Sequence, residues 1–208
     1  MRVLGIDPGT RHLGWGVVER TGTRLVHVAH GVIDTDTDEG LAARLVEIDD
    51  ALTTVIAEHR PEIGAIESLF FAKDAQSAAK LGHARGVVLL RLARSGLELH
   101  EYSPALVKRT IVGRGAAEKK QVAMVITAML KLPAEPRSDA ADALAIACTH
   151  LQAAGYHAAV RDVRAALPAQ GASPLASMIA ALAPRASKRP GGGRRPAAGR
   201  GGPRRGTT

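Results

Sequence analysis

Two short apolar runs in the first third of the chain each end in a carboxylate, and this pattern strongly constrains the fold. Residues 2–7 and 63–67 are strand-forming segments that end at Asp7 and Glu67. Between them, residues 38–60 place leucine, isoleucine and valine on one helical face. A strand, a helix and a second strand in this order favour a crossover and parallel pairing. The two carboxylates are therefore expected at one edge of a sheet, roughly 5 Å apart in the pairing direction.

A second pair of acids, Asp139 and Asp142, lies in a helix-forming run. Positions three apart share a helix face, where like charges repel. Mg²⁺ or Mn²⁺ would turn this repulsion into coordination, because both ions prefer carboxylate oxygens. Ser138 is a candidate N-cap, which would put both acids in the first turn, where the helix dipole also favours negative charge. The four acids together indicate a metal site.

The remaining pattern predicts an α/β fold. Strands are expected over 12–19 and 24–33, and the short turn between them implies antiparallel pairing. Further elements are expected as a strand over 97–102 and helices over 74–95, 103–112, 118–132 and 138 to about 154. The helix over 74–95 is apolar or small almost all round. This fits either a central core helix or a helix that also packs against a second subunit.

The positive charge of the chain is strongly segregated. The formal net charge is +8, and residues 185–208 hold eight of the 28 lysines and arginines with no acid. Residues 70–120 are also basic, which together with the acids indicates a polyanion held for metal-assisted chemistry. We expect a folded α/β domain over 1–155, a weakly structured Ala/Pro-rich extension over 156–184 and a disordered Arg/Gly/Pro-rich tail over 185–208.

Cysteine and histidine carry no chemistry in this interpretation. Cys148 is the single cysteine and is expected to be a small buried core residue, so no disulfide can form within the chain. No secretory signal or long apolar span is recognised, which favours a cytoplasmic protein without membrane association. His27 and His30 are expected on opposite sides of their strand and therefore to make a poor metal pair.

Five blocks in order over about residues 1–155 resemble the RuvC family of Holliday-junction resolvases. The blocks are Gly5-Ile6-Asp7-Pro8-Gly9-Thr10, Ala65-Ile66-Glu67-Ser68-Leu69-Phe70-Phe71-Ala72-Lys73, Leu81-Gly82-His83-Ala84-Arg85-Gly86, Gly113-Arg114-Gly115-Ala116-Ala117-Glu118-Lys119-Lys120-Gln121-Val122 and Asp139-Ala140-Ala141-Asp142-Ala143-Leu144-Ala145. The resemblance implies a ribonuclease-H-like five-stranded mixed sheet flanked by helices, and a homodimer that works beside RuvA and RuvB.

The resemblance also implies an activity and the residues that carry it. Asp7, Glu67, Asp139 and Asp142 would take the place of the catalytic metal-binding acids, with two Mg²⁺ ions per site and Mn²⁺ able to substitute. Lys108 and Lys119 would match the lysines near the cut phosphate, and Phe70 the aromatic that probes the junction. Lys73 and Arg114 lie in the same blocks and are further candidates for DNA contact. The implied reaction is paired symmetric nicking of a four-way junction, which leaves 5′-phosphate and 3′-hydroxyl ends.

Three alternatives stay open from the residues alone. Asp7-Pro8-Gly9-Thr10 with Gly14 and Gly16 also resembles the first phosphate loop of the actin, Hsp70 and sugar-kinase group, although no second such loop is found. A nuclease of the same fold could act on structured RNA instead. A basic DNA-binding module with a vestigial site is disfavoured because all four acids are present.

Overall fold

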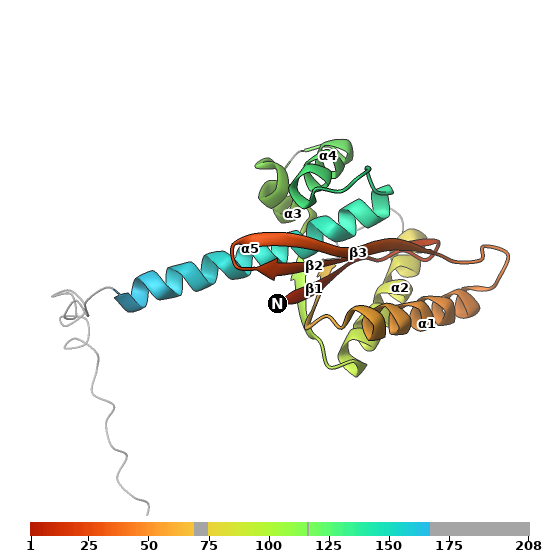
Figure 1. Cartoon of the computed structure of the whole chain (residues 1–208). Coiled ribbons are helices and arrows are strands. Elements are labelled where there is room, and N and C mark those ends of the chain that lie inside the picture. The colour runs from red at the N-terminus through yellow and green to blue at the C-terminus, as the bar shows by residue number, and fades with distance from the viewer. Residues whose placement is uncertain (69–74, 116, 167–208) are drawn as a thin grey trace, which may run out of the picture. The chain divides into compact units, whose positions relative to one another are not determined.

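A five-stranded mixed sheet organises the computed structural model, which describes residues 1–68, 75–115 and 117–166 (Figure 1). Its strands are β1 (Arg2–Asp7), β2 (His12–Thr21), β3 (Arg24–Asp34), β4 (Ile63–Glu67) and β5 (Glu98–Tyr102), in the spatial order β3-β2-β1-β4-β5. β1 lies at the centre, antiparallel to β2 and parallel to β4. The predicted parallel pairing of the two acid-ended strands is thus confirmed.

Helices cover both faces of the sheet (Figure 1). They are α1 (Leu41–His59), α2 (Ala75–Arg94), α3 (Pro104–Val112), α4 (Lys119–Leu130) and α5 (Ser138–Ala166). α1 and α2 cover one face, where Leu4 and Ile6 of β1 are fully buried among helix residues such as Leu52 and Val88. α3, α4 and α5 cover the other face, where Val3 packs in one cluster with residues of all three helices. β1 therefore contributes apolar side chains to two core layers, as expected for a central strand.

Local signals explain where several helices begin and end. Ser103 caps α3 by accepting a hydrogen bond from the Leu106 N–H, and Pro104 occupies the first helical position. Glu118 and Gln121 form a capping box at the start of α4. Arg60 ends α1 in the left-handed conformation, just before Pro61. These caps fix the short loops that bring α3 and α4 to the sheet.

α5 begins at the predicted residue but differs from its prediction in its N-cap and in where it ends. Ser138 is the first helical residue rather than the N-cap, because the Arg137 carbonyl already accepts the hydrogen bond from the Ala141 N–H. Asp139 lies in the first turn, and Asp142 lies beyond it, so the prediction that both acids share the first turn is wrong for Asp142. The helix also continues past Ala154 to Ala166. Alanine-rich sequence has a high helix propensity, which accounts for the longer helix.

The pairing of β2 with β3 contains a bulge that the sequence does not predict. Val17 pairs with Ala29 and Val18 pairs with His27, so Val28 is an extra residue on β3. The bulge brings His27 and His30 to the same face, where His27 Nε2 lies 2.8 Å from His30 Nδ1. The prediction that these histidines face opposite sides is therefore wrong, because a strand alternates its side chains only while its register is regular.

The sheet and its helices lie in one compact unit, Met1–Arg164. Cys148 is fully buried in it, as predicted. No helix in the described part of the chain is both long and apolar enough to span a membrane. The predicted tail over 185–208, and residues 167–184 of the predicted extension, lie outside the described residues.

Candidate active site

The carboxylates of Asp7 and Glu67 come together because β1 and β4 are parallel neighbours in register. Ile6 pairs with Ile66, so each acid follows a paired residue at the same edge of the sheet. Both side chains are only partly exposed, and both line a cavity of about 240 Å³. This part of the predicted site is present as the sequence indicates.

Close packing of α5 on the sheet brings the second pair of acids to the same place. A Cβ at Gly14 would lie 1.9 Å from the Asp139 carbonyl oxygen, and a Cβ at Gly5 would lie 2.1 Å from the Ala143 carbonyl oxygen. Only glycine permits this approach of helix backbone to strand backbone. Gly14 also pairs directly with Asp7 across β1 and β2. The start of α5 is therefore pressed against the strand beside Asp7.

Two lysines reach the acids from the helices α3 and α4. Lys119, the first residue of α4, places its Nζ 2.8 Å from Asp142 Oδ2. Lys108 of α3 lines the same cavity as Asp7, Glu67, Asp142 and Lys119. The structure thus gathers Asp7, Glu67, Asp142 and both predicted lysines around one cavity, while Asp139 does not line it. A larger cavity, of about 750 Å³, lies by the β2–β3 hairpin and the end of α4 and has no carboxylate in its lining.

The electrostatics of the cavity favour an added positive charge. Burial and, to a lesser extent, the charges of Asp142, Glu67 and Asp139 together raise the pKa of Asp7 to about 7, against the opposing effect of Lys119. Burial and the charge of Asp142 also raise the pKa of Glu67. The hydrogen bond to Asp142 raises the pKa of Lys119. The charge of Lys119 therefore does not offset the burial and the negative charge around Asp7.

The carboxylate oxygens of these acids suit a hard divalent cation. In the structure, the Lys119 ammonium contacts Asp142, one of the carboxylates that such an ion would use. Within residues 1–68, 75–115 and 117–166, no three acidic, histidine or cysteine side chains are close enough together to hold a metal ion as they stand. Asp7 and Glu67 are already neighbours at one sheet edge and line one cavity with Asp142, so three of the four acids surround the same space.

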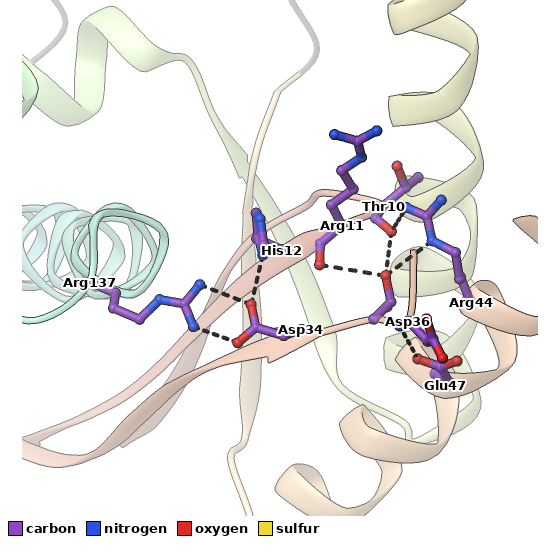
Figure 2. Close-up of polar contacts among 9 residues, drawn as sticks. Thr10, Arg11, His12, Asp34, Asp36, Arg44, Glu47 and Arg137 are labelled. Atoms are coloured by element: carbon purple, nitrogen blue, oxygen red, sulfur yellow. Dashed lines mark hydrogen bonds and ion pairs between the residues drawn. The ribbon is translucent and has the colours of Figure 1, made fainter. Parts of the chain in front are cut away.

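A polar cluster beside the site joins the end of β3 to the start of α5 (Figure 2). Asp34 pairs with His12 Nδ1 at 2.6 Å, and both terminal nitrogens of Arg137 donate to its carboxylate. This contact spans 103 residues. Next to it, Thr35 donates to the Thr10 carbonyl, and Arg44 donates to both residues. The cluster fixes the loop after Asp7 and the residue that precedes α5.

Comparison with known proteins identifies the family. The sequence profile described as crossover junction endodeoxyribonuclease RuvC matches residues 3–150. A crossover junction endodeoxyribonuclease RuvC of Sorangium cellulosum is 73% identical over 168 residues, which cover 81% of this chain and 94% of that protein. The chain belongs to the RuvC family. A RuvC of Pelobacter propionicus is 47% identical, over 83% of this chain and 97% of the relative.

Solved RuvC structures agree with the fold described above. A Thermus thermophilus RuvC in complex with Holliday junction substrate is 38% identical, with a TM-score of 0.71 over 76% of this chain and 96% of that one. A second structure of Thermus thermophilus RuvC gives a TM-score of 0.68. The predicted ribonuclease-H-like mixed sheet, and the predicted membership of the RuvC family, are thereby confirmed.

Of the remaining predicted DNA-contacting residues of this RuvC chain, Arg114 lies within the described residues. Arg114 is exposed in the loop between α3 and α4. Phe70 and Lys73 lie outside the described residues. Sequence reasoning missed two features beside the site: Arg85 was expected on a solvated helix face or a phosphate track but is buried, and the Asp34–Arg137 pair was not expected. Arg85 lies within a block that resembles the family, but its sequence position alone reveals neither its burial nor its partners.

Proposed function

We propose that this RuvC enzyme resolves Holliday junctions by metal-dependent hydrolysis at the cavity formed by Asp7, Glu67, Asp142 and Lys119, with Asp139 completing the metal ligands. The observation that carries this proposal is the convergence of strand-end and helix acids beside two lysines. It occurs in a chain 73% identical to a crossover junction endodeoxyribonuclease. A Thermus relative solved with Holliday junction substrate supports the choice of DNA over structured RNA or ATP.

Two Mg²⁺ ions are the proposed cofactor, and Mn²⁺ can replace them. When bound, the ions supply Lewis-acid stabilisation of the attacking and leaving oxygens of an in-line displacement at phosphorus. Asp7 and Glu67 would bind from the sheet edge, and Asp139 and Asp142 from α5. The raised pKa of Asp7 supports this assignment, because a bound cation would favour the ionised carboxylate.

The lysines act on the phosphate of the substrate. Lys119 is half of an ion pair with Asp142, and cation binding at Asp142 would free its ammonium to neutralise charge that develops on the phosphoryl oxygens. Lys108 lies on the same cavity and would hold the neighbouring backbone phosphate. Arg114 in the exposed loop, and Lys73, would extend this basic track along the bound strand.

The working form is proposed to be a homodimer, because two opposed cuts need two equivalent sites related by a two-fold axis. α2 supports this proposal. Its inner face buries Ala84, Val88 and Leu92, while Leu90 on the outer side is 51% exposed. An exposed leucine beside small residues on a long helix suits contact with a second copy. We also propose cooperation with RuvA and RuvB, and action in the cytoplasm, where bacterial DNA lies.

Phe70 is proposed to stack on bases at the crossover, since it follows Glu67 closely in the chain. Stacking of a base on an aromatic ring is worth about 1–3 kcal/mol. Phe70→Ala should lose cleavage of fully paired junctions and recover part of it when the crossover carries mismatches. Equal loss on both substrates together with a lower melting temperature would instead assign Phe70 to the core.

One assay tests the proposed function as a whole. The protein is incubated with a synthetic four-way junction, a linear duplex and an RNA hairpin, each with Mg²⁺ and with EDTA. Paired symmetric nicks on the junction alone, sealed by ligase and absent with EDTA, are the expected result. Cleavage of the hairpin, or junction cleavage in EDTA, would overturn the proposal.

A further inference from the structure

Arg85 is a buried arginine on α2 beside the active site. Only 7% of its surface is exposed. Its Nη1 donates to the backbone carbonyl of Glu67, and its Nη2 lies 2.8 Å from the Glu101 carboxylate on β5. Burying a guanidinium is costly unless its donors are paired, and both terminal nitrogens are paired here. The contact with Glu67 is made to its backbone and not to its carboxylate.

The Glu67 carbonyl needs a donor because of the way β4 ends. Ser68 donates its N–H to the Tyr102 carbonyl on β5, so alternation of the strand backbone turns the Glu67 carbonyl towards β1. Because Ile6 pairs with Ile66, the β1 residue whose N–H would be in register to donate to the Glu67 carbonyl is residue 8. That residue is Pro8, which has no N–H. The parallel pairing of β1 and β4 therefore lacks one backbone hydrogen bond at the sheet edge that carries the acids.

Arg85 reaches this gap from the helix side. Asp7, Pro8, Glu67 and Arg85 line one cavity of about 160 Å³, which adjoins the cavity of the active site through the shared Asp7 and Glu67. The guanidinium thus replaces the donor that Pro8 lacks, and Glu101 holds the guanidinium in place from the neighbouring strand. Because Arg85 contacts neither carboxylate of the site in the described structure, its effect is on the backbone that carries Glu67.

We propose that Arg85 is a positioning residue, which holds the end of β4 so that the Glu67 carboxylate faces Asp7 and Asp142. This inference rests on the proposed function, because it assumes that Glu67 binds the divalent cation. A positioning role predicts that loss of Arg85 weakens cation binding before any DNA is present. It also predicts that backbone amides at the end of β4 exchange faster with solvent.

The test compares Arg85→Gln and Arg85→Lys with a matched control on the same helix. Arg91 pairs with Asp49 and is also partly buried, but it lines neither of the two cavities at the acids. Mn²⁺ affinity of the DNA-free protein, hydrogen exchange of the peptide covering 63–68, melting temperature and the Mg²⁺ requirement for single-turnover cleavage are measured for each variant. Arg91→Gln controls for the loss of an arginine ion pair.

Arg85→Gln is expected to weaken Mn²⁺ binding at least 10-fold, to raise the Mg²⁺ requirement to a similar extent and to speed exchange in residues 63–68. Arg85→Lys is expected to restore part of the affinity, since an ammonium can donate to the same carbonyl. Arg91→Gln should lower the melting temperature without changing Mn²⁺ affinity. If Arg85→Gln does not fold, Arg85→Lys and Glu101→Gln are expected to show smaller changes in the same direction.

Wild-type Mn²⁺ affinity in folded Arg85 variants would overturn the inference, as would an equal loss of affinity in Arg91→Gln. Glu67→Gln separates this failure from a failure of the proposed site. If Glu67→Gln also keeps Mn²⁺ binding and cleavage, the site itself is wrong. If Glu67→Gln loses both while the Arg85 variants keep both, only the positioning role is wrong.

Discussion

Gly14 lies so close to the Asp139 carbonyl that a methyl group at its Cα would come within 1.9 Å of that oxygen. The atoms that this methyl group would meet are the backbone carbonyl oxygen and carbon of Asp139, so the contact cannot be relieved by rotation of a side chain. Gly14→Ala should force the start of α5 away from β2, at a cost of about 1–3 kcal/mol in the free energy of unfolding. It should also reduce cleavage, because Asp139 and Asp142 move with the helix. Thermal melting and single-turnover kinetics check both effects.

Gly40→Ala is the matched control for this substitution. Gly40 precedes α1 with a φ of −64°, and a Cβ there meets nothing within 4 Å. It should leave cleavage unchanged and change stability only slightly, because alanine reduces the entropy of the unfolded chain but is a poorer N-cap for α1 than glycine. A Gly14→Ala protein with the melting temperature and activity of the wild type would show that the approach of α5 is not required.

The four acids predict a separation of binding from cleavage. Asp7→Asn, Glu67→Gln, Asp139→Asn and Asp142→Asn should each abolish cleavage and leave junction binding intact or stronger. Each change removes charge that binds the cation and repels phosphate, while the basic residues remain. Binding in Ca²⁺ or EDTA and cleavage over a Mg²⁺ titration measure the two effects. Near-normal turnover of any variant at saturating Mg²⁺ would remove that residue from the site.

His150 should make the stability of the protein sensitive to acid. It is 4% exposed, its Nδ1 lies 2.8 Å from the Tyr102 hydroxyl, and burial with the neighbouring His100 and Arg20 lowers its pKa to about 4. The unfolded chain takes up the proton near pH 6.5, whereas the folded protein does so only near pH 4. Stability is therefore fully present above pH 6.5 and falls as the pH drops to 4, by at most roughly 3 kcal/mol.

His150→Gln should flatten this part of the pH profile, because glutamine keeps a polar partner for Tyr102 without titrating. Urea unfolding at pH 7, 6, 5 and 4 gives the slope for each protein. His83→Gln on the exposed side of α2 is the control and should keep the slope of the wild type. Parallel profiles for the wild type and His150→Gln would rule out the buried histidine as the source of the acid sensitivity.

The C-terminal charges predict a change in salt dependence. Residues 185–208 carry eight lysines and arginines and no acid. Each phosphate that they neutralise on duplex DNA adds about 0.9 to the slope of log K against log salt. Truncation after Pro184 should therefore flatten this slope and weaken binding to junction and duplex alike. Fluorescence titrations from 50 to 300 mM salt are the measurement, and an unchanged slope would assign the tail another role.

Sequence reasoning predicted the sheet, the parallel pairing of β1 with β4 and the approach of Asp7 to Glu67, because these follow from local pattern and chain connectivity. It missed the bulge at Val28, and with it the contact of His27 with His30, because one extra residue in a strand leaves no mark in the alternation of side chains. It also assigned Ser138 as the N-cap of α5, whereas Ser138 is the first helical residue. Arg137 replaces Ser138 as the cap position, where its side chain is held by Asp34, a partner 103 residues away.

The acids of the site were predicted from residue type, but the residues that hold the end of β4 in place were not. The acids stand out because their charges interrupt apolar or helical runs, whereas Lys108 and Lys119 were expected only from the resemblance to the family. Arg85 does not stand out, since an arginine on a helix is ordinarily solvated. Its burial depends on the end of β4, on Pro8 and on Glu101, which meet only in the folded sheet.

The order of the acids along the chain has a consequence for synthesis. Asp7 is on the first strand to leave the ribosome, while Asp139 and Asp142 are on α5, the last helix of the core. A nascent chain can pair β1 with β2 and β3 early, but it lacks half of the acids until α5 emerges and packs onto Gly5 and Gly14. If the proposed site is the catalytic one, truncated products that end before residue 139 would bind DNA without the acids needed to cut it.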